Sequence, residues 1–212
     1  MRLRQLRVLG IAGSLRVPSF SGLALEHAIG LVREIGCSAE IFDLQNNPLP
    51  FCNGNHGDLR PEYPAVARLR TSVARAHALI LATPEYHGGM SGVLKNVLDL
   101  LDFEHLRGKV VGGISVLGGS QNCNALNDIR RVLRWCHAWV IPEQIAIGHA
   151  RTVFADFHIS DPDLLSRFDE FVRSLLGSTF RLSDAFLPQD VVPNLHRCQE
   201  ADDEPRSLNL VR

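Results

Sequence analysis

The sequence predicts an open parallel α/β sheet with helices on both faces, because two patterns alternate along the chain. Short apolar runs without helical spacing are typical of buried parallel strands, and between them lie stretches with apolar residues three or four positions apart, as on one face of a helix. Loops rich in glycine and serine follow three of the apolar runs. One domain is the default for a chain of 212 residues with 45% hydrophobic residues.

Five repeats of strand and helix are expected. The predicted strands cover residues 7–12, 39–43, 77–83, 109–117 and 138–147, the last with an interruption before residue 145. The predicted helices cover residues 20–35, 64–76, 93–101, 126–133 and 161–175. In the strand order 2-1-3-4-5, strands one and three flank the switch point and strand four lies beside strand three, so the loops after these strands converge on one crevice. We expect a three-layer sandwich over residues 1–177 and an extended tail over 178–212, which contains prolines and an acidic run.

The first loop, residues 13–21, carries groups that suit an anion. These groups are three serine hydroxyls and one guanidinium, from Ser14, Ser19, Ser21 and Arg16. Gly13 lets the chain turn sharply, and the helix that begins at Phe20 adds free backbone amides. A single phosphate monoester, such as that of FMN, meets this description. An ordinary strand-to-helix turn capped by Ser19 or Ser21 is the alternative.

Other phosphate-binding loops lack support in this stretch. No Gly-Lys-Ser/Thr follows, as a nucleotide hydrolase requires, and Gly10 and Gly13 lack the third glycine of the dinucleotide fingerprint. No cysteine precedes Cys37, which argues against a cysteine-based phosphatase loop. A dehydrogenase that binds ribose through Asp43 is therefore disfavoured, although it stays open.

Two further loops follow predicted strands. Residues 84–92 read Pro-Glu-Tyr-His-Gly-Gly-Met-Ser-Gly, in which Tyr86 and His87 can present flat or hydrogen-bonding groups while the glycines allow backbone close to a planar ligand. Residues 118–121 read Gly-Gly-Ser-Gln, and the paired glycines can bring amides against a ligand edge. For these two glycines alone, a simple glycine turn is an equally good interpretation.

Composition excludes several classes of partner. The formal net charge of −1 gives no electrostatic reason to expect nucleic acid or an anionic membrane, and it speaks against a strongly acidic electron carrier. Five cysteines without a C-x-x-C pair predict free thiols, and the basic N-terminus is interpreted as part of the first strand, which together predict a cytoplasmic protein. Cys52 and His56 have no second ligand pair nearby, so no metal site is expected.

Three motifs taken together resemble the NADPH-dependent FMN reductase family, which includes quinone, azo-dye and chromate reductases. They are Gly13-Ser-Leu-Arg-x-x-Ser-x-Ser21, Pro84-Glu-Tyr-x-Gly-x-x-x-Gly-x-Leu-Lys-Asn96 and Gly118-Gly119, and the resemblance covers roughly the first two thirds of the chain. It implies a flavodoxin-like fold and non-covalently bound FMN, with the phosphate in the first loop and the ring edge against the other two. The cofactor-binding residues implied are Ser14, Arg16, Ser19, Phe20, Ser21, Pro84, Glu85, Tyr86, His87, Gly88, Gly118, Gly119, Ser120 and Gln121.

Two residues depart from the family pattern. Ser21 and His87 each stand where the family usually carries Asn. His87 could tune the flavin or contact the substrate, and an exposed loop histidine is the alternative. No catalytic acid or base is expected, because hydride transfer takes place at flavin N5, and the amides of Gly118 and Gly119 are candidates to stabilise charge on the reduced ring.

The resemblance implies an FMN-dependent oxidoreductase that takes hydride from NADPH or NADH and passes electrons to a small acceptor. Quinones, azo compounds, a metal ion such as chromate and free flavin are the acceptors considered. It also implies dimers or tetramers in which the helix after residue 91 contributes to the interface. The alternative is a flavodoxin-like electron-transfer protein that does not oxidise NAD(P)H directly.

Overall fold

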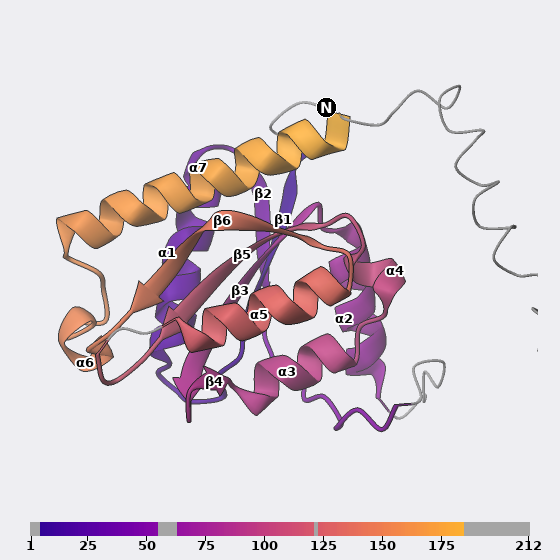
Figure 1. Cartoon of the computed structure of the whole chain (residues 1–212), viewed down its shortest axis with the longest axis horizontal. Helices are drawn as coiled ribbons and strands as arrows, with labels where there is room; N and C mark the ends of the chain where they lie inside the picture. The colour runs from indigo at the N-terminus through magenta and orange to yellow at the C-terminus, as the bar shows by residue number, and fades with distance from the viewer. Residues whose placement is uncertain (1–4, 55–62, 121–122, 185–212) are drawn as a thin grey trace, which may run out of the picture.

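A computed structural model describes residues 5–54, 63–120 and 123–184, and it contains a twisted parallel sheet between two layers of helices (Figure 1). The parallel strands are β1 (Arg7–Ala12), β2 (Ser38–Phe42), β3 (Ala78–Tyr86), β5 (Val110–Val116) and β6 (Trp139–Ile147), in the order β2-β1-β3-β5-β6. The two-residue β4 (Gly89–Met90) pairs antiparallel with β3 alone. The predicted order 2-1-3-4-5 is therefore confirmed once β4 is set aside.

Helices cover both faces of the sheet (Figure 1). On one face lie α1 (Phe20–Glu34) and α7 (Pro162–Asp184). On the other lie α2 (Pro64–Arg75), α3 (Gly92–Asp99) and α5 (Asn124–Trp135). Two short helices were not predicted from the sequence, α4 (Phe103–Leu106) and α6 (Ala150–Val153).

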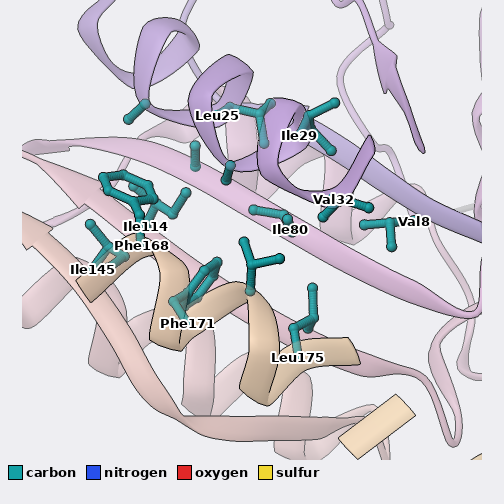
Figure 2. Close-up of a cluster of buried hydrophobic side chains, with 14 of the residues drawn as sticks. Val8, Leu25, Ile29, Val32, Ile80, Ile114, Ile145, Phe168, Phe171 and Leu175 are labelled. Atoms are coloured by element: carbon teal, nitrogen blue, oxygen red, sulfur yellow. The ribbon is translucent and has the colours of Figure 1, made fainter. Parts of the chain in front are cut away.

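Alternate residues of each strand supply the two halves of the core. Val8 and Ile80 belong to the cluster under α1 and α7, whereas their neighbours Leu9, Leu79 and Leu81 belong to the cluster under α2, α3 and α5. Figure 2 shows the first cluster, in which side chains from α1, α7 and four strands point toward one another. The sheet is thus apolar on both faces, and only its ends are free to carry polar chemistry.

The last helix corrects one boundary predicted from the sequence. We expected extended chain from residue 178, but α7 continues through these residues to Asp184, where Thr179 is buried and its hydroxyl donates to the Leu175 carbonyl at 2.6 Å. Gly177 did not end the helix because the apolar spacing continues past it, with Phe180 packed against the core. The remainder of the predicted tail, residues 185–212, lies outside the described residues.

The last strand also differs from the prediction in being continuous. We expected an interruption before residue 145, but β6 runs unbroken from Trp139 to Ile147. The sequence signal corresponds to a shift of register, because Val111 pairs with Val140 and Gly113 pairs with Gln144. Pro142 lies between the paired residues Val140 and Gln144, at a bulge in the strand. A proline, which has no backbone N–H, is tolerated at such a position because no hydrogen bond between strands is required of it. Within the described ranges, no helix is both long enough and apolar enough to cross a membrane.

Candidate cofactor site

The loops that follow β1, β3 and β5 meet in one pocket of about 180 Å³ at the carboxyl ends of the strands. Its lining residues are Ser14, Arg16, Pro18, Ser19, Phe20, Ser21, Pro84, Glu85, Tyr86, Val116, Leu117, Gly118, Ala150 and Arg151. The convergence predicted from the strand order is therefore confirmed. Residues far apart in the chain, such as Arg16, Tyr86 and Gly118, share one cavity.

The first loop both caps α1 and brings serine hydroxyls to the lining of the pocket. Ser19 is the N-cap of α1 and accepts a hydrogen bond from the Gly22 amide at 3.1 Å, while its hydroxyl lies 3.0 Å from that of Ser21. The Ser14 hydroxyl accepts from the Arg16 amide at 3.3 Å. The capped turn that we considered as an alternative is thus present, and the same hydroxyls line the pocket.

A buried serine that the sequence analysis did not single out joins the first two loops. Ser91, 1% exposed, donates its hydroxyl to the Gly13 carbonyl at 2.6 Å and accepts from the Leu94 amide at 3.1 Å, so it also caps α3. The Ser91 amide in turn donates to the buried Thr83 hydroxyl at 3.0 Å. Gly13 is required here, because a Cβ at this position would lie 2.6 Å from the Leu94 Cβ. The network fixes the first loop relative to the second.

The second loop is a two-residue hairpin between β3 and β4. Tyr86 pairs with Gly89, and the two residues between them, His87 and Gly88, have positive φ of 50° and 76°. Positive φ at both central positions is the requirement of a type I′ turn, for which Asn-Gly is the preferred sequence. Histidine is also among the residues that tolerate this conformation, so the backbone of the turn accommodates His87 where the family pattern has Asn.

The hairpin is attached to α5 through acidic side chains. Glu85 is 5% exposed and its Oε2 accepts from the Ala125 amide at 3.3 Å, while Oε1 has no hydrogen-bond partner among the described residues. Asp128 accepts from the Met90 amide at 3.2 Å. The Glu85 carboxylate is thus directed at the start of α5, where a helix favours negative charge.

The third loop is attached to the turn after β6. The His149 amide donates to the Gly119 carbonyl at 2.6 Å, and the Ala150 amide donates to the Leu117 carbonyl at 3.1 Å. These bonds place α6 beside the loop, and Arg151 in α6 lines the pocket. Arg151 was not predicted from the sequence, because only the loops after three strands were expected to contribute residues to the pocket.

The charges at the pocket are unbalanced. Arg16 and Arg151 are exposed, and within the described ranges neither guanidinium makes a hydrogen bond or an ion pair. The only carboxylate among the lining residues is that of Glu85, which is buried and engaged with α5. Two cations and several serine hydroxyls around one cavity favour an anion.

Asp43, considered above as a ribose ligand, is occupied within its own loop. Its Oδ1 accepts from the Gln45 amide at 2.8 Å and its Oδ2 from the Asn46 side chain at 2.5 Å. The Gln45 amide, together with Asn46, holds the pKa of the Asp43 carboxyl below its usual value. The carboxylate therefore caps a turn, which weakens the dehydrogenase alternative.

The structure brings most of the predicted cofactor-binding residues to the pocket and leaves a few beside it. His87, Gly88, Gly119 and Ser120 belong to the same loops but are not among the lining residues, and Gln121 lies outside the described residues. Pro18, Val116, Leu117, Ala150 and Arg151 line the pocket although they were not predicted. Among these, Val116 and Leu117 end an apolar run directly before the glycine pair, and that position was the available signal.

The residues present fit FMN in their chemistry. Serine hydroxyls, together with guanidiniums that have no partner among the described residues, suit the phosphate. Pro84, Tyr86 and Gly118 in the same lining offer a flat side chain and backbone without bulky side chains, as a planar ring requires.

The fold and the pocket define a flavodoxin-like α/β protein with a pocket lined by two arginines and several serines at the carboxyl edge of its sheet. Residues 6–152 match the pattern of one family within that class, described as NADPH-dependent FMN reductase. The chain belongs to this family, as the three motifs indicated.

Known proteins resemble the chain over different lengths. An NADPH-dependent FMN reductase ArsH of Shigella flexneri is 36% identical over 149 residues, which are 68% of this chain and 56% of the relative. An NADPH azoreductase of Bacillus sp. (strain OY1-2) is 36% identical over 126 residues, 59% of this chain and 66% of the relative. The chain therefore spans little more than half of the Shigella protein. The solved structure of FerB, a flavoenzyme NAD(P)H:(acceptor) oxidoreductase from Paracoccus denitrificans, has a TM-score of 0.71 at 21% identity and covers 83% of this chain and 98% of that one.

Proposed function

We propose that the chain is an FMN-dependent oxidoreductase that takes electrons from NADPH or NADH and passes them to a small acceptor. The observation that carries the proposal is the pocket at the carboxyl edge, whose lining combines Arg16, Arg151 and the serines of the first loop with Pro84, Tyr86 and Gly118. Membership of the NADPH-dependent FMN reductase family supports the same cofactor pair.

The protein's own groups bind and orient. Ser14, Ser19, Ser21 and Arg16 would hold the phosphate, and Tyr86 with the loop at Gly118 would hold the ring edge. When bound, FMN supplies the capacity to accept hydride from a nicotinamide and to release electrons to a second substrate. The amides at Gly118 and Gly119 are the groups we assign to stabilising negative charge at the ring edge. No side chain is assigned a catalytic proton, and His87 is proposed as a substrate contact on the hairpin beside the pocket.

The acceptor is proposed by class: a quinone, an azo compound, an oxidised metal ion or free flavin. Relatives are named for FMN reduction and for azo reduction, which makes these two classes the first to test. We further propose that the protein is cytoplasmic and assembles as a dimer or homotetramer through α3.

The test is an absorption spectrum of the purified protein followed by anaerobic addition of NADPH. We expect a yellow protein with FMN bound at one per chain, which NADPH bleaches and an added quinone or azo dye recolours. Bound FMN that NADPH cannot bleach would instead support the electron-transfer alternative. A protein that binds no flavin would refute the proposal.

A further inference from the structure

We propose that Arg151 is a second cation for a phosphate monoester in this pocket, acting with Arg16 on the 5′-phosphate of FMN. The inference rests on the proposed function and adds to it a residue that lies outside the three loops of the family motifs. It follows from where α6 is held, from the charges around the cavity and from the charge of the ligand.

The position of α6 is fixed by the core and not by Arg151 itself. Ala150 and Phe154 are each 2% exposed, and the Ala150 amide donates to the Leu117 carbonyl at 3.1 Å. The Phe154 ring stacks on that of Phe20, with centroids 5.4 Å apart and planes 12° apart. Phe20 is the first residue of α1, directly after the N-cap Ser19. The stack therefore attaches α6 to the phosphate loop, and Arg151 lies on the same short helix.

The Arg151 side chain makes no polar contact that would stabilise the fold in the part of the chain that the structure describes. No hydrogen bond or ion pair engages its guanidinium there, and the side chain is exposed while lining the cavity. Arg16 is in the same condition on the wall formed by the first loop. Like charges at one small cavity repel each other, so an anion between them would relieve the repulsion.

The charge of a phosphate monoester matches two cations better than one. Such a group carries between one and two negative charges near neutral pH and offers three acceptor oxygens. Arg16 alone would leave part of this charge to neutral serines and amides. The side chain of Glu85, the remaining charged residue of the lining, is engaged with α5 and does not neutralise either arginine.

The experiment compares FMN with riboflavin, which is the same ring without the phosphate. Apoprotein is prepared for wild type, Arg151→Ala, Arg151→Lys and Arg16→Ala, with Arg167→Ala as the control because Arg167 is an exposed arginine on α7. The dissociation constants of both flavins are measured by quenching of flavin fluorescence, and thermal melting verifies that each variant folds.

We expect Arg151→Ala to weaken FMN binding by about tenfold and riboflavin binding by less than about twofold, because a charge-assisted contact to phosphate is lost. Arg151→Lys should recover part of the FMN affinity, and Arg167→Ala should change neither constant. Equal weakening of FMN and riboflavin would overturn the proposal, since it would indicate lost packing.

A second arm identifies the source of the phosphate, because the 2′-phosphate of NADPH is also a monoester. The KM values for NADPH and NADH are measured on FMN-loaded wild type and Arg151→Ala. If Arg151→Ala raises the KM for NADPH but not for NADH, and its FMN affinity is unchanged, Arg151 is assigned to the nicotinamide cofactor. No change in either arm, with Arg16→Ala still impaired, would refute the role of Arg151 while the proposed function stands. A wild-type protein that binds neither flavin would refute both.

Discussion

Two pairs of basic side chains, one at each end of the sheet, differ in whether they have partners among the described residues. At that end Arg7 donates from Nε to the Arg75 carbonyl at 2.7 Å, and Lys109 donates from Nζ to the Ala76 carbonyl at 2.7 Å. His77 accepts the Arg7 amide at Nδ1, 3.0 Å away. Both acceptor carbonyls belong to the C-terminal end of α2, where a helix favours positive charge. At the carboxyl end, Arg16 and Arg151 have no such partners within the described ranges.

The difference follows from the direction of the helices. In a parallel α/β sheet each helix returns the chain to the amino end, so helix C-termini with free carbonyls gather there and helix N-termini with free amides gather at the carboxyl end. A cation beside a helix C-terminus can donate to a free carbonyl. A cation beside a helix N-terminus lies near backbone amides, which are donors like itself. The amino-end cations therefore stabilise the fold, and those at the carboxyl end remain available to an anionic ligand.

The largest effect is expected from Gly13→Ala, which would disturb the packing between the first loop and α3 at the carboxyl end of the sheet. A Cβ there would lie 2.6 Å from the Leu94 Cβ and 2.7 Å from the Ser91 hydroxyl, so the free energy of unfolding should fall by about 2–3 kcal/mol. Gly119→Ala is the control, since a Cβ at Gly119 meets no atom of the described residues within 4 Å, and it should cost less than about 0.5 kcal/mol. Denaturant unfolding of both apoproteins measures the difference. Equal losses would show that the first loop is not more tightly packed than the third.

Arg16→Ala should separate binding from stability. We expect FMN binding to weaken by about 1–3 kcal/mol through loss of a charge-assisted contact, while the free energy of unfolding of the apoprotein changes by less than about 0.5 kcal/mol. Fluorescence titration and denaturant unfolding give the two values. Unchanged FMN affinity would contradict the assignment of Arg16 to the phosphate.

Lys109→Met should show the opposite pattern at the amino end. It keeps an aliphatic chain but removes the donor to the Ala76 carbonyl, so the free energy of unfolding should fall by about 1 kcal/mol with FMN affinity unchanged. The same two measurements apply. A weaker affinity for FMN without loss of stability would reverse the comparison between the two ends.

The smallest effect is expected from titration of His77. Burial, together with the charges of Arg7 and Lys109, lowers the pKa of His77 below its ordinary value of 6.5. The unfolded chain therefore binds this proton more readily, so the stabilisation is complete above about pH 6.5 and decreases as the pH falls below it. His77→Asn keeps an acceptor for the Arg7 amide without the titration, and its free energy of unfolding should vary less between about pH 7.5 and 5.5. His27 and His105, whose pKa values burial also lowers, leave a residual slope in the variant. An unchanged slope would show that His77 does not contribute.

Local sequence patterns predicted the order of the elements and the convergence of the three loops. Each strand is a short apolar run and each long helix has regular apolar spacing, and both signals arise from neighbours within a few residues. The strand order and the location of the pocket then follow from general rules on parallel sheets. The family motifs predicted that the loop at residues 13–21 and the Pro84-Glu-Tyr loop contribute to one site, and residues of both line the pocket.

What these patterns could not contain is contact between distant residues. The hydrogen bond from the Ser91 hydroxyl to the Gly13 carbonyl joins positions 78 residues apart, and the sequence around either residue does not predict it. Arg151 reaches the pocket because Phe154 stacks on Phe20, more than a hundred positions earlier in the chain. The continuation of α7 past Gly177 is accompanied by packing of Phe180 against the core, which the sequence of that segment does not show.

The amino-acid sequence by itself determined the fold, the family and the loops that form the site, because these depend on local periodicity and on short motifs. Only the tertiary structure decided which cations are bonded to carbonyls and which have no partner in the part of the chain that the structure describes. The same side chain is structural at a helix C-terminus and available to a ligand at a helix N-terminus, and that placement exists only once the chain has folded.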